Sequence, residues 1–468
     1  MVDKSYDLAV IGAGPGGYVA AIRASQLGLK AAVIEKDKAG GVCGNWGCIP
    51  SKALINQAGM FNEVSHLEKM GLKVDASGFD YSKVHAVSRK AATKSGKGVE
   101  YLLKKNKIDL ISGTAELTSG KEVKVSGGKD GDITVEAKHV LIATGSRSRE
   151  IPGFEFDEEQ VLSSTGILSL KELPKSLVIL GAGAIGMEFA YVMGCFGVDV
   201  TIVEMMDRLL PLEDAEVSKV MEGEFKKLGI KFHTGVKAGD LKKTKSGISI
   251  SMETRDGKKE SLKAEKILVA VGRAPNSENL GLDNLGIRTE KGFIKVNDYY
   301  QTDISGVYAI GDVISSPLLA HVASKEGEIA VEHMAGHAGS EARIDPDEIP
   351  GAVYTEPGVG SFGPTEEQAK ERGLNYASYS FPYSGIGKAN AIEKGSGVVK
   401  IIYDKDSHEI LGGHVVGYSA TELVHEILLA KKSELLPEDV ATMIHAHPTI
   451  SEGIMEAARG VEGWAIHI

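Results

Sequence analysis

Cysteine is scarce in this sequence, and its scarcity is the first constraint on function. The chain has 3 cysteines among 468 residues, too few for the disulfide framework of a secreted protein. Two of them, Cys43 and Cys48, stand close together in the glycine-rich stretch GGVCGNWGCIPSK at 40–52. In a reducing compartment, a close cysteine pair is more often catalytic or metal-binding than structural. The third, Cys195, lies at an apolar helix end, where we expect it to fill a core.

Further metal ligands are lacking near the pair. A zinc site needs about four ligands, yet no second cysteine pair or adjacent histidine cluster accompanies residues 43–48. We therefore expect no metal. The alternative that both cysteines are small buried hydrophobic residues fits poorly with the glycines around them.

Excess positive charge and long apolar runs are also missing. The formal net charge is -11, and such a field repels polyphosphate, so nucleic acid and anionic membranes are not expected partners. The longest apolar run, 176–198, contains Glu188 and several glycines, so it would be a poor membrane span. The N-terminus has no basic segment followed by a long apolar one. We expect a soluble, cytoplasmic protein of several domains.

One pattern occurs twice: strand, glycine turn, helix, strand. The two copies are YDLAVIGAGPGGYVAAIRASQLGLKAAVIEK at 6–36 and KSLVILGAGAIGMEFAYVMGCFGVDVTIVEM at 175–205. In both copies, an acidic residue stands 23 positions after the first glycine. The matching residues are Gly12, Gly14, Gly17 and Glu35 in the first copy, and Gly181, Gly183, Gly186 and Glu204 in the second.

Each part of this pattern suits a dinucleotide. The first glycine permits a tight turn, the second lets the backbone approach a pyrophosphate, and the third allows close packing of helix on strand. The helix N-terminus offers free N–H groups to the anion. The carboxylate accepts hydrogen bonds from ribose hydroxyls and repels a 2′-phosphate. One copy could be a helix-packing device alone, but two in register predict two bound dinucleotides.

Three further segments end apolar strands in turns. KHVLIATGSRSREIPG (138–153) and EKILVAVGRAPNS (265–277) end in glycine turns, and GVYAIGDV (306–313) ends on Asp312. We interpret them as crossings between domains. From about Asp345 strands alternate with longer helices, which predicts a separate C-terminal α+β domain.

The second cysteine has a predicted helical setting. Pro50 suits the first turn of a helix through PSKALINQAGMF (50–61), which places Cys48 at the helix N-terminus. There we expect the helix dipole to lower the pKa of its thiol. Lys52, four residues further on, shares that helix face.

Over its whole length the chain resembles the flavin-dependent disulfide oxidoreductases. The resemblance rests on the two dinucleotide units, CGNWGCIPSK (43–52), AIGDV (309–313) and HAHPTISE (445–452). It implies an α/β fold with two Rossmann-like dinucleotide-binding domains, for FAD and NAD, and a C-terminal α+β dimerisation domain. The implied domains are 1–147 (FAD, first part, with the redox disulfide), 148–273 (NAD), 274–344 (FAD and central, second part) and 345–468 (dimerisation).

The resemblance also implies residue roles. Cys48 is the thiolate beside the flavin, Cys43 exchanges with substrate, and Lys52 pairs with Glu188. His447 is the general base, oriented by Glu452, since a thiol must lose its proton before it attacks a disulfide. The implied cofactor contacts are Gly12, Gly14, Gly17, Glu35, Lys52, Gly113, Thr144, Gly145, Ser146, Asp312, Leu318, Ala320 and His321 for FAD, and Gly181, Gly183, Gly186, Glu204, Val236 and Gly272 for NAD.

The histidine motif has a plainer alternative. Thr449 and Glu452 have capping-box spacing for a helix through SEGIMEAARG (451–460). We favour the base for His447, because an imidazole with a carboxylate partner titrates near neutral pH, and expect His445 to be structural.

The activity implied is oxidation of protein-bound dihydrolipoyl groups by a homodimer that serves a 2-oxo acid dehydrogenase or related multienzyme complex, with NAD⁺ as acceptor. Alternatives are an NAD(P)H-dependent reductase of another disulfide, a metal or a quinone, or a mainly structural flavin-bearing subunit. The C-terminus EGWAIHI (462–468) lacks the cysteine pair of a mercuric reductase, and neutral Met205 and Met206 after Glu204 weaken an NADPH-linked enzyme, although Arg208 is near. Gly44 and Trp46 replace the more usual leucine and valine, which leaves the redox potential and substrate fit open.

Overall fold

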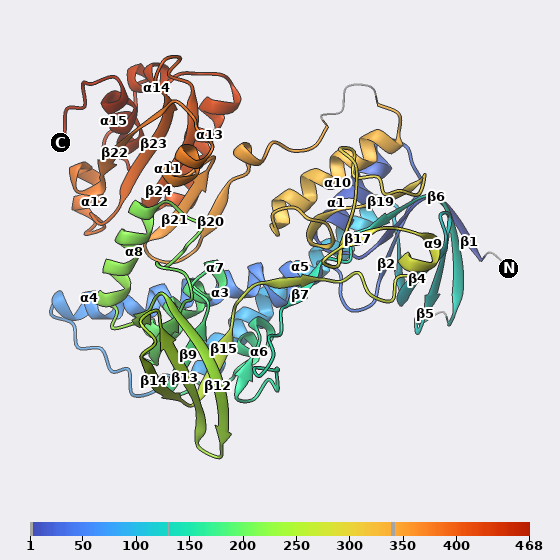
Figure 1. Ribbon diagram of the computed structural model, residues 1–468, viewed down its shortest axis with the longest axis horizontal. Coiled ribbons are helices and arrows are strands. Elements are labelled where there is room, and N and C mark those ends of the chain that lie inside the picture. The colour runs from blue at the N-terminus through green and yellow to red at the C-terminus, as the bar shows by residue number, and fades with distance from the viewer. Residues whose placement is uncertain (1–2, 130, 338–341) are drawn as a thin grey trace. The chain divides into compact units, whose positions relative to one another are not determined.

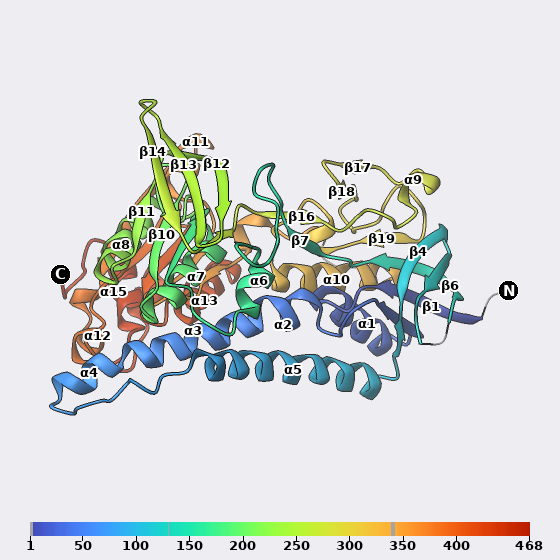
Figure 2. The same ribbon diagram turned by 90° about the horizontal axis from the view of Figure 1, so that it is seen from below.

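The chain folds into two compact units. The structure, a computed structural model, describes residues 3–129, 131–337 and 342–468. Unit 1 comprises Met1–Ala53, Ser82–Arg149 and Gly272–Ile344, and unit 2 comprises Leu54–Tyr81, Glu150–Val271 and Asp345–Ile468. Figures 1 and 2 show the course of the chain through both. Two of the divisions between the units, at 149/150 and 271/272, fall inside segments interpreted as crossings, whereas the third such segment, 306–313, lies within unit 1, so its interpretation as a crossing is wrong.

Unit 1 is built on a seven-stranded sheet. Its order is β3-β2-β1-β6-β5-β4, and β19 pairs with β6. The central pairs β1–β2, β1–β6, β2–β3 and β6–β19 are parallel, and β4–β5 and β5–β6 are antiparallel. The strands are β1 (Lys4–Ile11), β2 (Ala31–Glu35), β3 (Asp109–Ser112), β4 (Thr114–Ser119), β5 (Glu122–Ser126), β6 (Ile133–Ile142) and β19 (Val307–Ala309).

Helices cover this sheet. They are α1 (Pro15–Gln26), α2 (Gly41–Trp46), α9 (Leu282–Leu285) and α10 (Ala320–Met334), together with the first residues of α3 (Cys48–Asn62) and nearly all of α5 (Tyr81–Lys105). Small residues let α1 and α10 lie side by side (Figure 1): a Cβ on Gly327 would come within 2.9 Å of the Gly16 carbonyl oxygen. The smaller elements are β7 (Ser146–Ser148), β16 (Arg273–Pro275), β17 (Thr289–Glu290), β18 (Phe293–Ile294) and the 3₁₀ turn η1 (Gly311–Val313).

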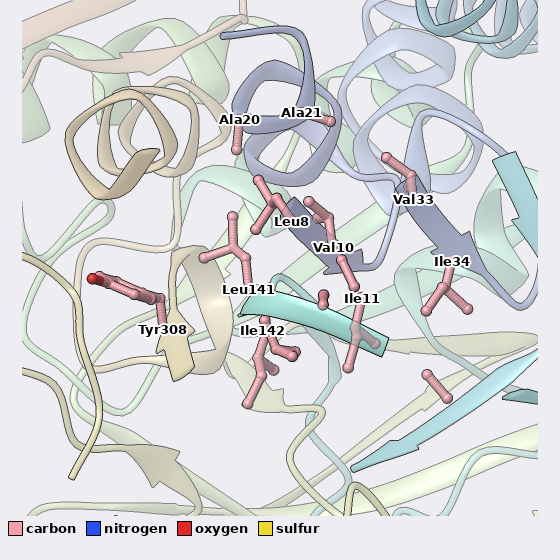
Figure 3. Packing of buried hydrophobic residues seen from close by; sticks show 14 of the residues in the cluster. Leu8, Val10, Ile11, Ala20, Ala21, Val33, Ile34, Leu141, Ile142 and Tyr308 are labelled. Carbon is pink, nitrogen blue, oxygen red and sulfur yellow. The ribbon is translucent and has the colours of Figure 1, made fainter. Parts of the chain in front are cut away.

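The core of unit 1 lies between the sheet and these helices. Figure 3 shows Leu8 and Val10 of β1 pointing toward Ala20 and Ala21 of α1, with Leu141 of β6 beside them. All five are 0 % exposed. Continuous apolar runs of this kind are typical of parallel strands that are covered on both faces. Because β1 is packed in this core, its C-terminal end is held in place, and the glycine turn follows directly from that end.

Unit 2 repeats the parallel arrangement. Its first sheet has the order β11-β10-β9-β15-β8, and all of its pairs are parallel. Beside it are an antiparallel sheet, β12-β13-β14, and several helices. The elements are β8 (Val161–Leu162), β9 (Ser176–Leu180), β10 (Asp199–Val203), β11 (Lys231–His233), β12 (Val236–Thr244), β13 (Gly247–Thr254), β14 (Lys259–Ala264), β15 (Lys266–Val269), α4 (Val64–Lys69), α6 (Ser164–Ser169), α7 (Ala184–Cys195) and α8 (Ala215–Lys227).

The C-terminal part of unit 2 carries its own antiparallel sheet, in the order β20-β21-β24-β23-β22. Helices α13 and α15 contribute Val424, Ile427 and Ile454 to its apolar core. The elements are β20 (Gly351–Val353), β21 (Gly358–Phe362), β22 (Tyr376–Pro382), β23 (Val398–Asp404), β24 (Ile410–Gly417), α11 (Glu366–Glu371), α12 (Gly387–Ala391), α13 (Ala420–Lys432), α14 (Pro437–Thr442), α15 (Glu452–Val461), η2 (Pro346–Glu348) and η3 (Tyr383–Gly385).

The predicted α/β class is therefore present, with both strand–turn–helix–strand units formed. Within the described ranges, no helix combines the length and apolar character needed to span a membrane.

Candidate active site

The first glycine turn is shaped as its sequence predicts. Gly12 has φ +108°, and a Cβ there would lie 2.3 Å from the Ala143 carbonyl oxygen. A Cβ on Gly17 would lie 1.9 Å from the Gly12 carbonyl oxygen, whereas one on Gly14 would meet no described atom within 4 Å. Of the three, Gly14 is therefore the one that faces open space, as the approach of a pyrophosphate to the N-terminus of α1 requires. A bare backbone N–H cradle of this kind fits a dinucleotide.

Glu35 ends β2 beside this turn. One carboxylate oxygen accepts the Ala13 N–H at 2.8 Å, and the other accepts the Asp37 N–H at 2.8 Å. Gly113 follows β3 and donates its N–H to the Glu35 carbonyl oxygen at 3.0 Å. The predicted ribose-binding carboxylate is thus fixed at the carboxyl edge of the parallel strands, where dinucleotides bind.

The second turn has the same construction in unit 2. Gly181 has φ +99°, and its Cβ would lie 2.5 Å from the Ala270 carbonyl oxygen. Glu204 accepts the N–H groups of Ala182 and Met206, both at 2.7 Å. Val236 donates its N–H to the Glu204 carbonyl oxygen at 3.0 Å. Gly183 caps α7, and a Cβ on Gly186 would lie 2.0 Å from the Gly181 carbonyl oxygen.

Arg208, the one cation that sequence places near Glu204, is already paired. Its guanidinium donates to Glu367 at 2.6 Å and to the Glu213 carbonyl oxygen at 3.1 Å. That pairing raises the pKa of Arg208 and satisfies its charge. A 2′-phosphate would therefore meet the carboxylate of Glu204 with the nearby cation already engaged, which favours NAD over NADP.

Ser146 and Asp312 meet in unit 1, as the predicted set of cofactor residues requires. The Ser146 hydroxyl donates a short hydrogen bond to Asp312. Arg273 completes the cluster: its Nε donates to Ser146 Oγ at 2.6 Å, and it lies 3.6 Å from Asp312. The guanidinium is mostly buried, and burial lowers its pKa while the negative charges of Asp312 and Cys48 oppose that shift.

A buried carboxylate supports the turn that carries Asp312. Glu326 of α10 is 1 % exposed and accepts the Gly311 N–H at 2.6 Å. Burial raises the pKa of Glu326 to about 7. Sequence reasoning missed both Arg273 and Glu326. An arginine inside the glycine turn GRAPN (272–276) could have indicated Arg273 as a functional residue. Nothing in the helix sequence distinguishes Glu326 from a surface glutamate.

The other predicted FAD contacts lie along the same unit. Thr144 and Gly145 are tied to Asn276: the Thr144 hydroxyl donates to the Asn276 carbonyl oxygen at 2.7 Å, and the Asn276 N–H donates to the Gly145 carbonyl oxygen at 2.9 Å. Leu318 precedes α10, and Ala320 and His321 begin it. Gly272, predicted for NAD, belongs to unit 1, where its carbonyl oxygen accepts the Arg149 N–H at 3.1 Å.

The cysteine segment packs directly on the first glycine turn. Gly40 donates its N–H to the Ala13 carbonyl oxygen at 2.9 Å. Gly41 begins α2 with φ +56°, and its Cβ would lie 2.7 Å from the Cα of Gly14. A side chain at Gly41 would separate the redox segment from the dinucleotide turn, and Gly40 has a φ of +95°, a left-handed conformation that favours glycine.

Cys43 and Cys48 face each other as free thiols. A side-chain hydrogen bond with Cys48, burial and the negative charge of Cys48 raise the pKa of the Cys43 thiol strongly, whereas the Lys52 charge and a hydrogen bond with the Cys48 backbone act to lower it. The electrostatic environment of Cys43 therefore favours its protonated thiol form. Helix α3 begins at Cys48 itself, so the predicted helix N-terminal position is observed.

Lys52 and Glu188 fall in different units, so their pairing stays a prediction. Glu188 lies on α7, is 6 % exposed, and accepts the Tyr354 N–H at 3.1 Å. That contact joins the second dinucleotide helix to the start of the C-terminal sheet within unit 2.

His447 and Glu452 form the expected pair in unit 2. His447 Nδ1 lies 2.9 Å from Glu452 Oε1, and the imidazole side chain is 75 % exposed. Burial acts to raise the pKa of Glu452, but hydrogen bonds from His447 and the Thr449 N–H lower it below its usual value. The carboxylate therefore stays ionised and holds the ring, leaving Nε2 directed away from its partner.

Only one half of the capping box is formed, because Glu452 accepts the Thr449 N–H at 3.0 Å while the Thr449 side chain caps no helix N–H. Thr449 donates its hydroxyl to the Ala446 carbonyl oxygen at 2.7 Å instead of accepting from the helix, and the cap of α15 is Ser451, with no side-chain hydrogen bond. His445 has a different environment: its side chain is 3 % exposed, with Nε2 2.7 Å from Glu426. This agrees with a structural role.

Two dinucleotide turns, a thiol pair packed on the first and a histidine–carboxylate pair define a nucleotide-dependent disulfide oxidoreductase. Residues 6–327 match the pyridine nucleotide-disulphide oxidoreductase family and residues 349–458 match its dimerisation domain, and the chain belongs to this family. The predicted fold class, family and enzyme class are thereby confirmed, and FAD and NAD are the cofactors that go with them.

Among its relatives are two named dihydrolipoyl dehydrogenases. The Bacillus subtilis protein is 44% identical over 473 residues, covering 99% of both chains. The mitochondrial protein of Pisum sativum is 42% identical, covering 99% of this chain and 92% of its own. Among solved structures, LpdA from Mycobacterium tuberculosis superposes with a TM-score of 0.89 at 27% identity, covering 98% of this chain and 99% of that one.

Proposed function

We propose that this protein oxidises protein-bound dihydrolipoyl groups to lipoyl and passes the electrons through Cys43, Cys48 and FAD to NAD⁺. The observation that carries the proposal is the position of the thiol pair: it begins immediately after Gly40 and Gly41, which pack on the dinucleotide turn. The identity to named dihydrolipoyl dehydrogenases over nearly the whole chain supports this substrate class.

The cofactor sites follow from the two turns. FAD is held by 1–147 and 274–344, through Gly12, Glu35 and the Ser146–Asp312 pair, and NAD by 148–273, through Gly181 and Glu204. When bound, FAD supplies a two-electron carrier between a thiolate and a nicotinamide. The chain itself contributes placement, together with the charge of Lys52 near Cys43 and the charge of Arg273 near Cys48.

The thiol chemistry needs one base and one exchange partner. His447 takes a proton on Nε2 from a dihydrolipoyl thiol, while Glu452 holds Nδ1. The substrate thiolate attacks Cys43 Sγ, the Cys43–Cys48 bond breaks, and Cys48 leaves as the thiolate. The second substrate sulfur then displaces Cys43 and its proton passes to the departing Cys43 sulfur, so one lipoyl disulfide forms while the protein disulfide becomes the Cys43 thiol and the Cys48 thiolate, and His447 holds the other proton. Lys52, paired with Glu188, stabilises the thiolate.

The assembled enzyme is a homodimer joined through 345–468. The match of this region to a dimerisation domain supports that assembly. In this proposal the partner subunit's His447 acts at the disulfide of each protomer, as the resemblance to the family implies. The lipoyl substrate belongs to a 2-oxo acid dehydrogenase or related complex, and the low cysteine content supports a cytoplasmic location.

Turnover by the isolated protein tests the proposal. Dihydrolipoamide with NAD⁺ is expected to be the productive pair, and glutathione disulfide, metal ions and quinones with NADH or NADPH poor ones. Cys43→Ser is expected to abolish turnover, whereas Cys195→Ser, at the buried third cysteine, retains it. Preference for one of the other acceptors, or activity that survives Cys43→Ser, would contradict the assignment.

Complementation tests the shared site. Cys43→Ser and His447→Gln chains, each inactive alone, are co-refolded with a tag on one chain, so that heterodimers can be isolated. One of the two sites in each heterodimer then has both groups intact, and activity is expected to return. If isolated heterodimers stay inactive, the base acts within its own chain.

A further inference from the structure

Trp46 lies between the two redox cysteines, at the end of α2, and its indole is held from three directions. The Nζ of Lys38 is 5.2 Å from the ring centroid, and the guanidinium of Arg89 is 4.7 Å from it. The indole Nε1–H donates to Asp37 Oδ2 at 3.2 Å. The indole ring of Trp46 contacts two cations and its single N–H donor is hydrogen-bonded, so the side chain has little freedom to rotate.

The acceptor of the indole leads toward the FAD turn. Asp37 also donates its backbone N–H to Glu35 Oε1 at 2.8 Å, and the other oxygen of Glu35 accepts the Ala13 N–H. Trp46 is therefore connected, through two hydrogen bonds, to the carboxylate expected at the ribose of the cofactor. The redox segment and the loop after β2 form one hydrogen-bonded assembly.

The cation on the ring leads to a different element. Arg89 lies on α5 and donates a short hydrogen bond to the Asn45 carbonyl oxygen, next to Trp46 in the chain. Gly44 lets α2 approach the same helix, because a Cβ there would lie 3.2 Å from Ser95 Oγ. Figure 2 shows α5 running alongside α2. The small residue at 44 and the large one at 46 thus serve one packing arrangement.

We propose that Trp46 is a positioning residue that ties the segment between Cys43 and Cys48 to α5 and to the loop after β2, and thereby keeps the two sulfurs in register when the disulfide opens. This inference rests on the proposed redox role of the two cysteines. The substrate contacts neither Trp46 nor Arg89 in this proposal, and both act through the cysteines.

The contacts of Trp46 affect the thiol–disulfide equilibrium of Cys43 and Cys48. Reduction by glutathione consumes two glutathione thiols and yields one glutathione disulfide and the Cys43–Cys48 dithiol. A dithiol held in register loses little freedom when it closes again, so the protein disulfide resists reduction. Without the ring, the dithiol state gains freedom and the disulfide becomes easier to reduce, by about fivefold if one cation–π contact and one hydrogen bond are lost.

The experiment measures the thiol–disulfide equilibrium in the holoenzyme. Protein is equilibrated in buffers of graded reduced and oxidised glutathione and alkylated, and the fraction of Cys43 and Cys48 protected as a disulfide is read by mass spectrometry. Trp46→Val and Arg89→Met are the test variants, and the second carries the test if the first does not fold. Trp46→Phe keeps an aromatic ring for the cation–π contacts and removes the Nε1–H donor.

Tyr6→Val is the matched control. Tyr6 lies in the same unit, with Lys30 Nζ 4.7 Å from its ring centroid and its hydroxyl donating to Asp109 at 2.6 Å. Its removal deletes the same kinds of contact from β1 instead of the redox segment.

The expected result is half-reduction at about a fivefold lower ratio of squared reduced glutathione to oxidised glutathione in Trp46→Val and Arg89→Met, a smaller shift in Trp46→Phe, and none in Tyr6→Val. Wild-type ratios in both test variants, or an equal shift in Tyr6→Val, would overturn the positioning role. If wild-type protein forms no Cys43–Cys48 disulfide at any ratio, the proposed redox function fails, and this inference with it.

Discussion

The two glycine turns of the chain are nearly identical in backbone and differ in what surrounds them. A Cβ on Gly12 would lie 2.3 Å from a carbonyl oxygen of the neighbouring strand end, and one on Gly181 would lie 2.5 Å from the corresponding oxygen. Glu35 and Glu204 each accept two backbone N–H groups, at 2.8 Å and 2.7 Å. The sites predicted for the two pyrophosphates and riboses therefore share one backbone construction.

The difference begins directly after the carboxylates. In unit 1, Asp37 and Lys38 are tied to Trp46 and so to the redox segment. In unit 2, Met205 and Met206 are 66 % and 51 % exposed. The same turn is thus followed by a segment tied to the redox cysteines in unit 1 and by exposed methionines in unit 2.

The largest expected effect comes from filling each turn. Gly12→Ala forces a Cβ onto the Ala143 carbonyl oxygen, so we expect protein purified without FAD and without turnover. Gly181→Ala is expected to retain FAD and lose NAD⁺ reduction. Bound flavin and steady-state turnover check both. Gly28→Ala is the control, because its φ of +85° is equally left-handed but its Cβ meets no described atom within 4 Å. Equal FAD content in all three variants would contradict distinct roles for the turns.

Glu204 is expected to set nucleotide choice. Glu204→Ala removes an acceptor of ribose hydroxyls and a repulsive charge, so the ratio of kcat/KM for NAD⁺ over NADP⁺ should fall by about 10- to 100-fold. Glu35→Ala, the matched change in unit 1, should leave that ratio unchanged while weakening FAD retention. Glu367→Ala frees Arg208 and should improve NADP⁺ use slightly. Equal use of both nucleotides by the wild-type protein would refute the assignment.

A smaller effect concerns the pH dependence of unit 1. Burial raises the pKa of Glu326 from its ordinary value of 4.5 to about 7 in the folded chain, so between these values the folded chain holds a proton that the unfolded chain has released. Stability therefore falls as pH rises from about 4.5 to 7, by on the order of 1–3 kcal/mol from this group. Glu326→Gln keeps an acceptor for the Gly311 N–H and should flatten the dependence. Thermal unfolding at pH 5 and pH 8 measures it, and identical pH profiles would argue against the buried carboxyl.

The parts of the site that are built from residues close together in the chain could be predicted from the sequence. The two glycine turns, the helix that starts at Cys48 and the His447–Glu452 pair each follow from residues within about a turn or one strand–helix unit of each other. The contacts of Trp46 with Arg89 and of Ser146 with Arg273 join residues that are 43 and 127 positions apart. Such pairings depend on how helices and strands pack, and no periodicity or motif in either partner encodes them.

The predicted pairing of Lys52 with Glu188 joins residues of different units. Each is placed within its own unit, Lys52 by its charge on Cys43 and Glu188 by its bond to the Tyr354 N–H. Their predicted pairing depends on the two units together, so it stays a prediction that mutation of either partner can address.

Partial reduction of the holoenzyme tests most directly whether Cys48 is the thiolate beside FAD and Cys43 the exchange partner. One equivalent of dithionite or dihydrolipoamide should produce a long-wavelength thiolate-to-flavin absorption band in wild-type protein. Cys43→Ser should show the band without reduction and without dihydrolipoamide turnover, and Cys48→Ser should bind FAD and lack the band under all conditions. A band that survives in Cys48→Ser, or full dihydrolipoamide turnover in both variants, would contradict the assignment.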